Sequence, residues 1–250
     1  MSGILDVTGV SKKFGGIQAV DGANFSLGKP GIYGLIGPNG AGKTTMFDII
    51  CGRQVPDAGE VRFHARRIDG VKPYKLAREG LARTFQECRV LPEETCLNNV
   101  LFAAQDKRLG SEMLQAFTRS ATARRNAELE ARRLLKLIDI ERYADDPASA
   151  LSYGQRRLLE IVSCLMSKPR ILLLDEPASG INPTLLNTLH DFLVEIYEET
   201  KIVFLIVEHN MEFIMSLATD IVVMHQGRVL AQGTPERIQS DKSVIDAYLG

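Results

Sequence analysis

Residues 37–45, with the sequence GPNGAGKTT, carry glycines, a lysine and threonines at the spacing of a phosphate-binding loop, G-x-x-x-x-G-K-[ST]. They follow the apolar run GIYGLIG and precede an apolar helical pattern, so backbone N–H groups and a helix N-terminus can receive an anion there. Lys43 can reach the terminal phosphates of a nucleotide, and the Thr44 hydroxyl can ligate Mg²⁺. The candidate nucleotide-binding residues are Gly37, Pro38, Asn39, Gly40, Ala41, Gly42, Lys43, Thr44 and Thr45.

Two acids end a second apolar run, ILLLDEP, at residues 171–177. Asp175 at the tip of the expected strand can hold Mg²⁺ through water, and Glu176 can polarise an attacking water. The alternative is an acidic strand end that caps the following helix. A phosphate loop in the same chain favours the metal and hydrolytic roles.

His209, in VEHN, lies just after a third apolar run, IVFLIV, residues 202–207. The carboxyl ends of parallel strands form the ligand side of an α/β sheet, so this side chain can contact a γ-phosphate. A structural histidine is the alternative. The other histidines, to which we assign no role, are His64, His190 and His225.

Two further candidates depend on their position in the chain. Gln86 lies in RTFQE, between an expected α/β core and a helical insertion, where it could sense metal or water; a solvated surface residue is the alternative. Phe14 precedes a Gly-Gly turn and could stack on a base, which contributes about 1–3 kcal/mol in comparable cases. A core phenylalanine is the alternative for Phe14.

The segment LSYGQ, residues 151–155, predicts a second helix start that can bind an anion. Ser152 is a favourable N-cap in front of the apolar helix pattern RRLLEI, and the backbone N–H groups near Gly154 point out of that helix start. Ser152 and Gly154 are therefore candidates for binding an anion.

These candidates require an α/β fold with a mainly parallel sheet. Fully apolar runs such as those ending at Asp175 and before His209 suit strands buried on both faces. The chain is expected to be one domain, in which residues 1–86 and 166–250 form the nucleotide-binding core and residues 87–165 form a helical subdomain. Antiparallel strands are expected at both ends of the chain, including a hairpin around Gln226–Gly227.

The composition excludes several classes. The chain has 250 residues, 45% hydrophobic and 24% charged, and a net charge of −1, which disfavours non-specific nucleic-acid binding. Its apolar runs are too short to span a bilayer, and no secretion signal is expected. The four cysteines show no C-x-x-C pair, so a cytoplasmic chain with reduced thiols is expected.

The motifs together resemble the ATP-binding subunit of an ABC transporter, over nearly the whole chain and in the family's order. The matching features are Phe14 (adenine-stacking aromatic), GPNGAGKTT (phosphate loop), Gln86 (glutamine loop), LSYGQ (signature), ILLLDEP (second phosphate-site strand), ASGIN (the loop after it) and His209 (switch histidine). Other segments, such as RTFQ, VEHNMEF and VIDAYLG, resemble ATPases of branched-chain amino-acid importers, and the urea-importer branch is also similar.

The resemblance implies ATP and Mg²⁺ as cofactors and a P-loop NTPase core with an N-terminal antiparallel β-subdomain and a helical signature subdomain. It implies catalytic roles for Glu176, His209, Gln86 and Lys43, and metal contacts from Thr44, Gln86 and Asp175. It also implies a head-to-tail dimer with a second ABC ATPase subunit, identical or related, in which the signature of one subunit completes the ATP site of the other. The signature residues implied to bind nucleotide are Ser152, Gly154 and Gln155. Transmembrane permease subunits, and indirectly a solute-binding protein, are the other implied partners, so the chain would be peripheral on the inner face of the cell membrane.

Two positions depart from the family pattern: Tyr153 stands where the signature usually has glycine, and Asn182 where the loop after Glu176 usually has aspartate. A soluble ABC ATPase of translation or DNA repair is a competing interpretation, but such proteins usually carry two ATPase units or a long coiled coil. A nucleotide-gated regulator without turnover is disfavoured by Glu176 and His209. A GTPase lacks support because no N-K-x-D motif is present, and a small-molecule kinase would not explain LSYGQ.

Overall fold

The computed structural model describes residues 3–84, 90–103 and 121–249. Contacts divide the chain into two compact units, which we describe separately. The first unit comprises Met1–Arg83, Arg170–Ala178 and Ile196–Gly250, and the second comprises Thr84–Pro169 and Ser179–Glu195. The subdomain boundaries expected from the sequence, at residues 86/87 and 165/166, stay a prediction.

A six-stranded sheet forms the centre of the first unit. Its strands in spatial order are β10 (Arg228–Gly233), β9 (Asp220–His225), β3 (Ile32–Ile36), β8 (Val203–Val207), β7 (Ile171–Asp175) and β6 (Leu81–Arg83). All neighbours are parallel except β10 and β9. Every residue of β3, β7 and β8 is buried, as the continuous apolar runs predict for strands covered on both faces.

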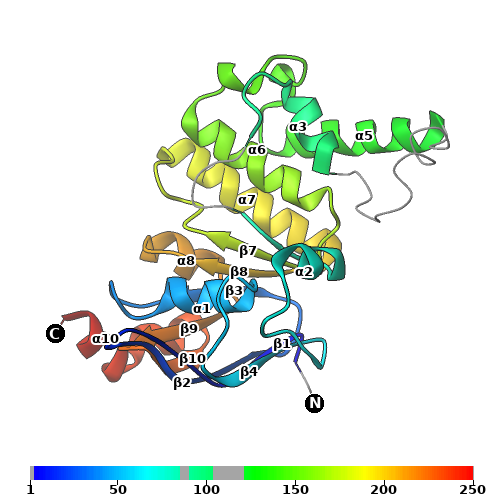
Figure 1. The fold of residues 1–250 in the computed structure, drawn as a ribbon. Coiled ribbons are helices and arrows are strands. Elements are labelled where there is room, and N and C mark those ends of the chain that lie inside the picture. The colour runs from blue at the N-terminus through cyan, green and yellow to red at the C-terminus, as the bar shows by residue number, and fades with distance from the viewer. Residues whose placement is uncertain (1–2, 85–89, 104–120, 250) are drawn as a thin grey trace. The chain divides into compact units, whose positions relative to one another are not determined.

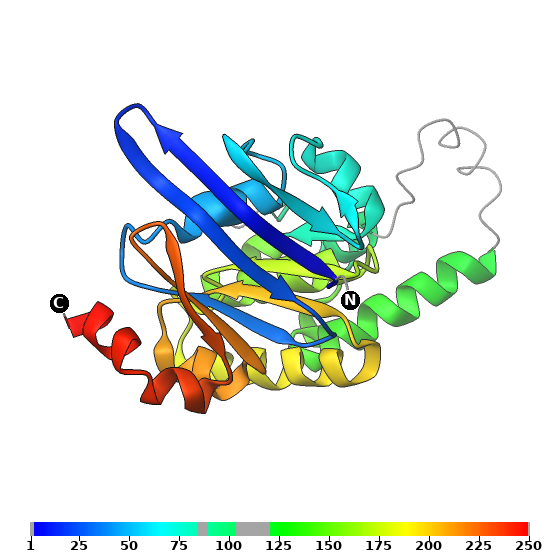
Figure 2. The same ribbon diagram turned by 90° about the horizontal axis from the view of Figure 1, so that it is seen from below.

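A second, antiparallel sheet in this unit has the order β2-β1-β4-β5. Its strands are β1 (Leu5–Phe14), β2 (Ile17–Leu27), β4 (Ala58–Phe63) and β5 (Arg66–Arg67). Figure 2 shows the long hairpin of β1 and β2 in blue. Irregular pairing of β1 with β4 brings Gly59 so close to Gly9 that a Cβ on Gly59 would overlap the Gly9 carbonyl group.

The core of this unit lies around α1 (Lys43–Ile50). Met46, Phe47 and Ile50 of α1 belong to one buried apolar cluster with residues of both sheets, including Leu5 of β1 and Leu35 of β3. Figure 1 shows α1 between β3 and the strands of the antiparallel sheet. The phosphate loop is therefore held at the start of a helix that both sheets fix in place.

Shorter elements complete the first unit: α2 (Pro73–Glu79), α8 (Met211–Leu217), α9 (Pro235–Ser240) and α10 (Lys242–Leu249). The predicted hairpin around Gln226–Gly227 is confirmed, because β9 and β10 are antiparallel and both turn residues have positive φ, 47° and 79°. Such φ values are those of a tight two-residue hairpin turn.

The second unit is helical in its described residues. Its elements are α3 (Cys96–Ala103), α5 (Ala121–Leu137), η1 (Glu141–Tyr143), η2 (Ala148–Ala150), α6 (Tyr153–Leu165) and residues 183–195 of α7 (Pro183–Thr200). Helix α3 packs against both α5 and α6. Over the described part of the chain, no helix combines the length and the apolar character needed to cross a membrane.

Candidate functional site

The candidate phosphate loop connects β3 to α1, and Lys43, Thr44 and Thr45 form the first turn of that helix. Lys43 is only 5% exposed, and its Nζ donates hydrogen bonds to the carbonyl oxygens of Gly37 at 2.8 Å and Pro38 at 3.0 Å. Burial lowers the pKa of Lys43, against the opposing effect of the Glu176 carboxylate. The ammonium group thus lies inside the loop, where incoming phosphate oxygens could replace the two carbonyls.

At two positions of this loop another part of the backbone comes so close that only glycine fits. Gly37 has φ 148°, and a Cβ there would overlap the carbonyl oxygen of Met224 in β9. Gly42 has φ 98° as the N-cap of α1, and a Cβ there would overlap the carbonyl oxygen of Ala19 in β2. The loop can hold its N–H groups in this arrangement only because these positions carry no side chain.

The two acids of ILLLDEP have different surroundings. Asp175 ends β7 and is 2% exposed, and its Oδ2 accepts a hydrogen bond from Arg83 at 2.8 Å. Glu176 follows with φ 46°, a left-handed conformation that is uncommon for a residue with a side chain and tends to occur at functional sites. Its backbone N–H donates to the carbonyl oxygen of Val207 in the neighbouring strand β8.

Glu176 and His209 are brought together at the carboxyl ends of adjacent parallel strands. Asp175 pairs with Val207 in the register of β7 and β8, so the residues that follow the two strands meet at one edge. The Nε2 atom of His209 lies 3.1 Å from Oε1 of Glu176. Both side chains are partly exposed, 45% and 33%, so a substrate can reach the pair.

Sequence reasoning missed Glu208, a buried carboxylate beside this pair. Glu208 is 3% exposed, and its Oε1 accepts the N–H of Ala178 at 2.7 Å. Its Oε2 accepts the N–H groups of His209 at 2.9 Å and Asn210 at 3.1 Å. Burial raises the pKa of Glu208, although the three N–H donors oppose that shift. One carboxylate therefore joins the loop after Glu176 to the loop that carries His209.

Glu208 had a signal in the sequence, because it is an acid at the end of the apolar run IVFLIV and directly precedes His209. Arg83 was also missed, and its signal was a basic residue at the end of a short strand just before Gln86. Gln86 itself lies outside the described residues, so its metal and catalytic roles stay a prediction.

Phe14 is the last residue of β1, and its side chain is 44% exposed. Its ring is therefore available to a ligand, and stacking on a base stays a prediction. The Lys12 Nζ lies 5.6 Å from the centre of this ring and donates to Asp57 Oδ1 at 2.8 Å. The Lys13 N–H donates to the other oxygen of Asp57 at 2.7 Å, so Asp57 fixes the end of β1 just before Phe14.

In the second unit, Ser152 is the N-cap of α6, as predicted. The Ser152 hydroxyl accepts the N–H of Gln155 at 3.3 Å, and the Ser152 N–H donates to the Gln155 side chain at 2.9 Å. This reciprocal pair is a capping box. Gly154 is packed closely, since a Cβ there would lie 2.9 Å from a methyl group of Leu185 in α7. Nucleotide contacts from these residues stay a prediction.

Tyr153, the departure from the usual signature, lies against the loop that contains Gly180. The ring is 47% exposed, and a Cβ on Gly180 would lie 2.9 Å from its Cε1 atom. Gly180 also has φ 70°, which favours glycine. Tyr153 thus covers a glycine of the ASGIN segment, and both belong to the second unit.

The side-chain oxygen atoms of Thr44 and Asp175, both in the first unit, suit a magnesium ion that binds together with phosphates. Thr44 offers a hydroxyl oxygen and Asp175 a carboxylate oxygen, and Mg²⁺ prefers oxygen ligands while keeping several waters or phosphate oxygens. Within the described residues there is no group of three or more His, Cys, Asp or Glu side chains that could hold a metal alone. A site with few protein ligands agrees with an ion that arrives with its nucleotide.

Comparisons with known proteins agree with these features. A family model described as "ABC transporter" matches residues 20–179, and one described as "Branched-chain amino acid ATP-binding cassette transporter" matches residues 228–250. The chain is 40% identical to the high-affinity branched-chain amino acid transport ATP-binding protein BraF of Pseudomonas aeruginosa, over 99% of this chain and 98% of that protein. It is 38% identical to the LivG protein of the same description from Escherichia coli, over the same shares.

A solved structure, described as the ADP conformation of an ATP-binding cassette of an ABC transporter, is similar with a TM-score of 0.83 and 30% identity. The match covers 100% of both chains. The expected α/β nucleotide-binding fold is therefore confirmed by a solved relative.

Proposed function

The chain belongs to the ABC transporter family of ATPases, and we propose that it hydrolyses Mg²⁺-ATP to drive an importer of branched-chain amino acids. The observation that carries the hydrolytic assignment is the 3.1 Å contact between His209 Nε2 and Glu176 Oε1. This pair lies at the ligand side of the sheet that also carries the phosphate loop. The choice of solute rests on the names of BraF and LivG.

The proposed reaction begins with the phosphates of ATP in the loop before α1. Lys43 exchanges the carbonyl oxygens of Gly37 and Pro38 for β- and γ-phosphate oxygens, and it keeps its charge in a partly dehydrated place where that charge acts strongly. Thr44 and Asp175 would hold a magnesium ion, which would supply charge neutralisation at the phosphates when bound.

Glu176 then orients the water that attacks the γ-phosphate and accepts a proton from it, while the bond between the γ-phosphorus and the bridging oxygen breaks and ADP leaves. His209 contacts both the Glu176 carboxylate and the γ-phosphate, and so holds these two groups in place relative to each other. General-base assistance of this kind contributes about 10²–10⁴-fold to rates. Two observations support this assignment. The left-handed backbone of Glu176 is of the kind found at functional sites. The Glu208 carboxylate accepts the backbone N–H groups of Ala178 and His209, and so joins the two segments that carry the pair.

We infer that Ser152 and Gly154 bind the γ-phosphate of an ATP held by a second ABC ATPase subunit, whose own signature serves the first chain's ATP. One exposed helix N-terminus contributes only about 0.3–1 kcal/mol toward an anion, and more when water is excluded. A dimer interface provides that exclusion. ATP binding would close the dimer and hydrolysis would open it, a population shift that permease subunits can use.

In this proposal the chain is peripheral on the inner face of the membrane, attached through permease subunits, and a solute-binding protein delivers the amino acid to them. The choice of solute then lies with the permease subunits and the solute-binding protein. Phe14 stacks on the adenine, and Gln86 contacts the metal or the attacking water.

The test is uptake by proteoliposomes that contain this chain, its partner ATPase and the permease subunits, with a loaded solute-binding protein outside and ATP inside. The proposal predicts ATP-dependent accumulation of radiolabelled leucine, isoleucine or valine, and none in liposomes made with the Glu176→Gln variant. Accumulation of urea without these amino acids would instead establish the urea-importer alternative. Hydrolysis without uptake of any solute would contradict an importer role.

A further inference from the structure

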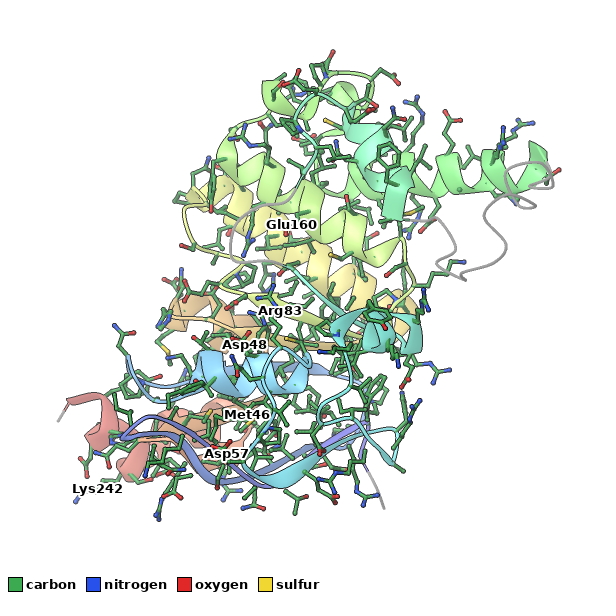
Figure 3. All side chains as sticks on the ribbon, viewed as in Figure 1. Met46, Asp48, Asp57, Arg83, Glu160 and Lys242 are labelled. Atoms are coloured by element: carbon green, nitrogen blue, oxygen red, sulfur yellow. The ribbon has the colours of Figure 1, made fainter. Side chains whose placement is uncertain are left out.

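Arg83 is a buried cation at the end of β6, inside the first unit. Its side chain is 8% exposed, and the two carboxylates that pair with it belong to two other elements of this unit, α1 and β7. Figure 3 labels Arg83 and Asp48, which lie close together beside α1. No role described above uses this arginine beyond its bond to Asp175.

The guanidinium group bridges two carboxylates through different nitrogens. One nitrogen, Nη1, donates to Oδ1 of Asp48 in α1 at 2.5 Å, and the other, Nη2, donates to Oδ2 of Asp175 at the end of β7 at 2.8 Å. Nη1 also lies 3.0 Å from Sγ of Cys51, and the guanidinium carbon lies 4.8 Å from the centre of the Phe47 ring. A planar fork with several N–H donors suits this arrangement, and a lysine ammonium does not.

The charge balance of this cluster favours the ionised arginine. Burial acts to lower the pKa of Arg83, but its neighbours Cys51, Asp48 and Asp175 outweigh burial and raise it. Removing one partner of a buried ion pair leaves the other charge uncompensated and is strongly destabilising. Arg83 therefore links α1 to β7 through its bonds to Asp48 and Asp175.

The same two elements carry the proposed magnesium ligands. Thr44 is in the first turn of α1, and Asp48 is four residues further along the same face of that helix. Asp175 is both the second proposed ligand and the second carboxylate of the bridge. A bond from Arg83 to Asp48 and Asp175 thus sets the spacing between the helix of Thr44 and the strand of Asp175.

We propose that Arg83 is a positioning residue for the magnesium site: it fixes the Asp175 carboxylate relative to the helix of Thr44, and Thr44 and Asp175 are the residues that would hold the ion. This inference rests on the proposed function and deepens it. Partners of metal-binding residues commonly change metal affinity by about 10–100-fold when they are altered.

The test compares equilibrium binding of ATP in Mg²⁺ with binding in EDTA, and takes the ratio of the two affinities. The wild-type ratio gives the strengthening of ATP binding by Mg²⁺, which we call the enhancement ratio. The Asp175→Asn variant, which lacks a proposed magnesium ligand, shows the ratio when this strengthening is lost. Arg83→Lys keeps the charge but cannot bond both carboxylates through separate nitrogens, and Asp48→Asn weakens the bridge from the other side. Arg66→Met is the control, because Arg66 is an exposed arginine paired with Glu79.

We expect Arg83→Lys to lower the enhancement ratio about 10-fold while its affinity in EDTA stays within about twofold of wild type. Asp48→Asn should lower the ratio less, and Arg66→Met should not change it. Binding of Mn²⁺ with ATP, followed by electron paramagnetic resonance, should weaken in parallel.

A wild-type ratio in both Arg83→Lys and Asp48→Asn would overturn the inference. So would an equal loss of affinity in Mg²⁺ and in EDTA, because that result would mean a general disturbance of the loop. If wild type itself shows no enhancement by Mg²⁺, or if Asp175→Asn keeps it, the proposed function fails first, and the two failures are thus distinguishable.

Discussion

His209 Nε2 and Glu176 Oε1 lie 3.1 Å apart at the carboxyl ends of the adjacent parallel strands β8 and β7. The contact does not depend on long, freely rotating connections. Glu176 is held by its backbone bond to Val207, and His209 by the Glu208 carboxylate. A carboxylate and an imidazole in hydrogen-bond reach of each other form an arrangement suited to activating and positioning a water.

Replacing Glu176 with glutamine should separate binding from chemistry. The amide keeps the size of the side chain and cannot accept the proton of the attacking water, so we expect hydrolysis to fall about 100-fold or more. ATP affinity should stay near the wild-type value. Phosphate release and equilibrium ATP binding measure the two quantities, and a variant that hydrolyses ATP at the wild-type rate would exclude Glu176 as the base.

Replacing Glu208 with glutamine should disturb the pair formed by Glu176 and His209 while leaving both of these residues unchanged. A glutamine has one acceptor oxygen, so its amide nitrogen would face at least one backbone N–H of Ala178, His209 or Asn210. We expect a loss of about 1–3 kcal/mol in the free energy of unfolding, because a buried donor loses its acceptor. The rate of hydrolysis should fall as well, with little change in ATP affinity.

Thermal unfolding and steady-state ATPase rates measure the Glu208→Gln effects. Glu212→Gln, at an exposed position in the first turn of α8, is the matched control. If Glu208→Gln had the unfolding temperature and the ATPase rate of the wild type, the hydrogen bonds of Glu208 would not position His209.

Replacing Ser152 with arginine should abolish ATP-driven dimer formation. The side chain would fill the helix start that is proposed to receive the partner's γ-phosphate, and would remove the capping box with Gln155. Light scattering with and without ATP, in the Glu176→Gln background that retains nucleotide, measures the effect. ATP binding to the monomer should persist. Ser149→Arg, at an exposed serine in η2, is the control and should dimerise normally. If Ser152→Arg formed dimers at the ATP concentrations at which the wild type does, an ATP site shared between two subunits would be contradicted.

Replacing Asp57 with asparagine should loosen the end of β1 that carries Phe14. Figure 3 labels Asp57 beside the strands of the antiparallel sheet. Hydrogen bonds from the Lys12 ammonium and then from the Lys13 N–H hold the pKa of Asp57 below its usual range. A carboxyl whose pKa is lowered by folding stabilises the fold above its unfolded pKa, and the stabilisation disappears as the pH falls through the folded value.

Wild type should therefore unfold at a higher temperature than Asp57→Asn at neutral pH, and the difference should shrink as the pH falls below about 4. The exposed Asp246 offers a control variant, Asp246→Asn, with no such pH-dependent difference. If the difference in unfolding temperature between wild type and Asp57→Asn stayed constant down to acidic pH, the ionised Asp57 carboxylate would not stabilise this strand.

Much of the fold was predictable because its signals are local. The buried strands β3, β7 and β8 are continuous apolar runs, and the β9–β10 turn has residues that accept positive φ. Ser152 as a helix cap was predictable in the same way. Its capping partner Gln155 also has the spacing of a capping box, S-x-x-Q.

Glu208 and Arg83 were not predicted because their roles depend on which strands are neighbours. The order β8-β7-β6 places Arg83 beside the strand of Asp175, and the register of β7 and β8 places Glu208 beside Ala178. Neither neighbour is near in the chain. Tyr153 lies against Gly180 for the same reason, because helix packing within the second unit brings the two segments together.

The most direct test of the account measures ATP hydrolysis and leucine accumulation in the same proteoliposomes, with wild type and with Glu176→Gln. The account predicts that wild type releases phosphate and accumulates leucine, and that Glu176→Gln loses both together while it still binds ATP. Leucine accumulation that continues in Glu176→Gln without phosphate release would contradict the claim that hydrolysis at Glu176 drives import.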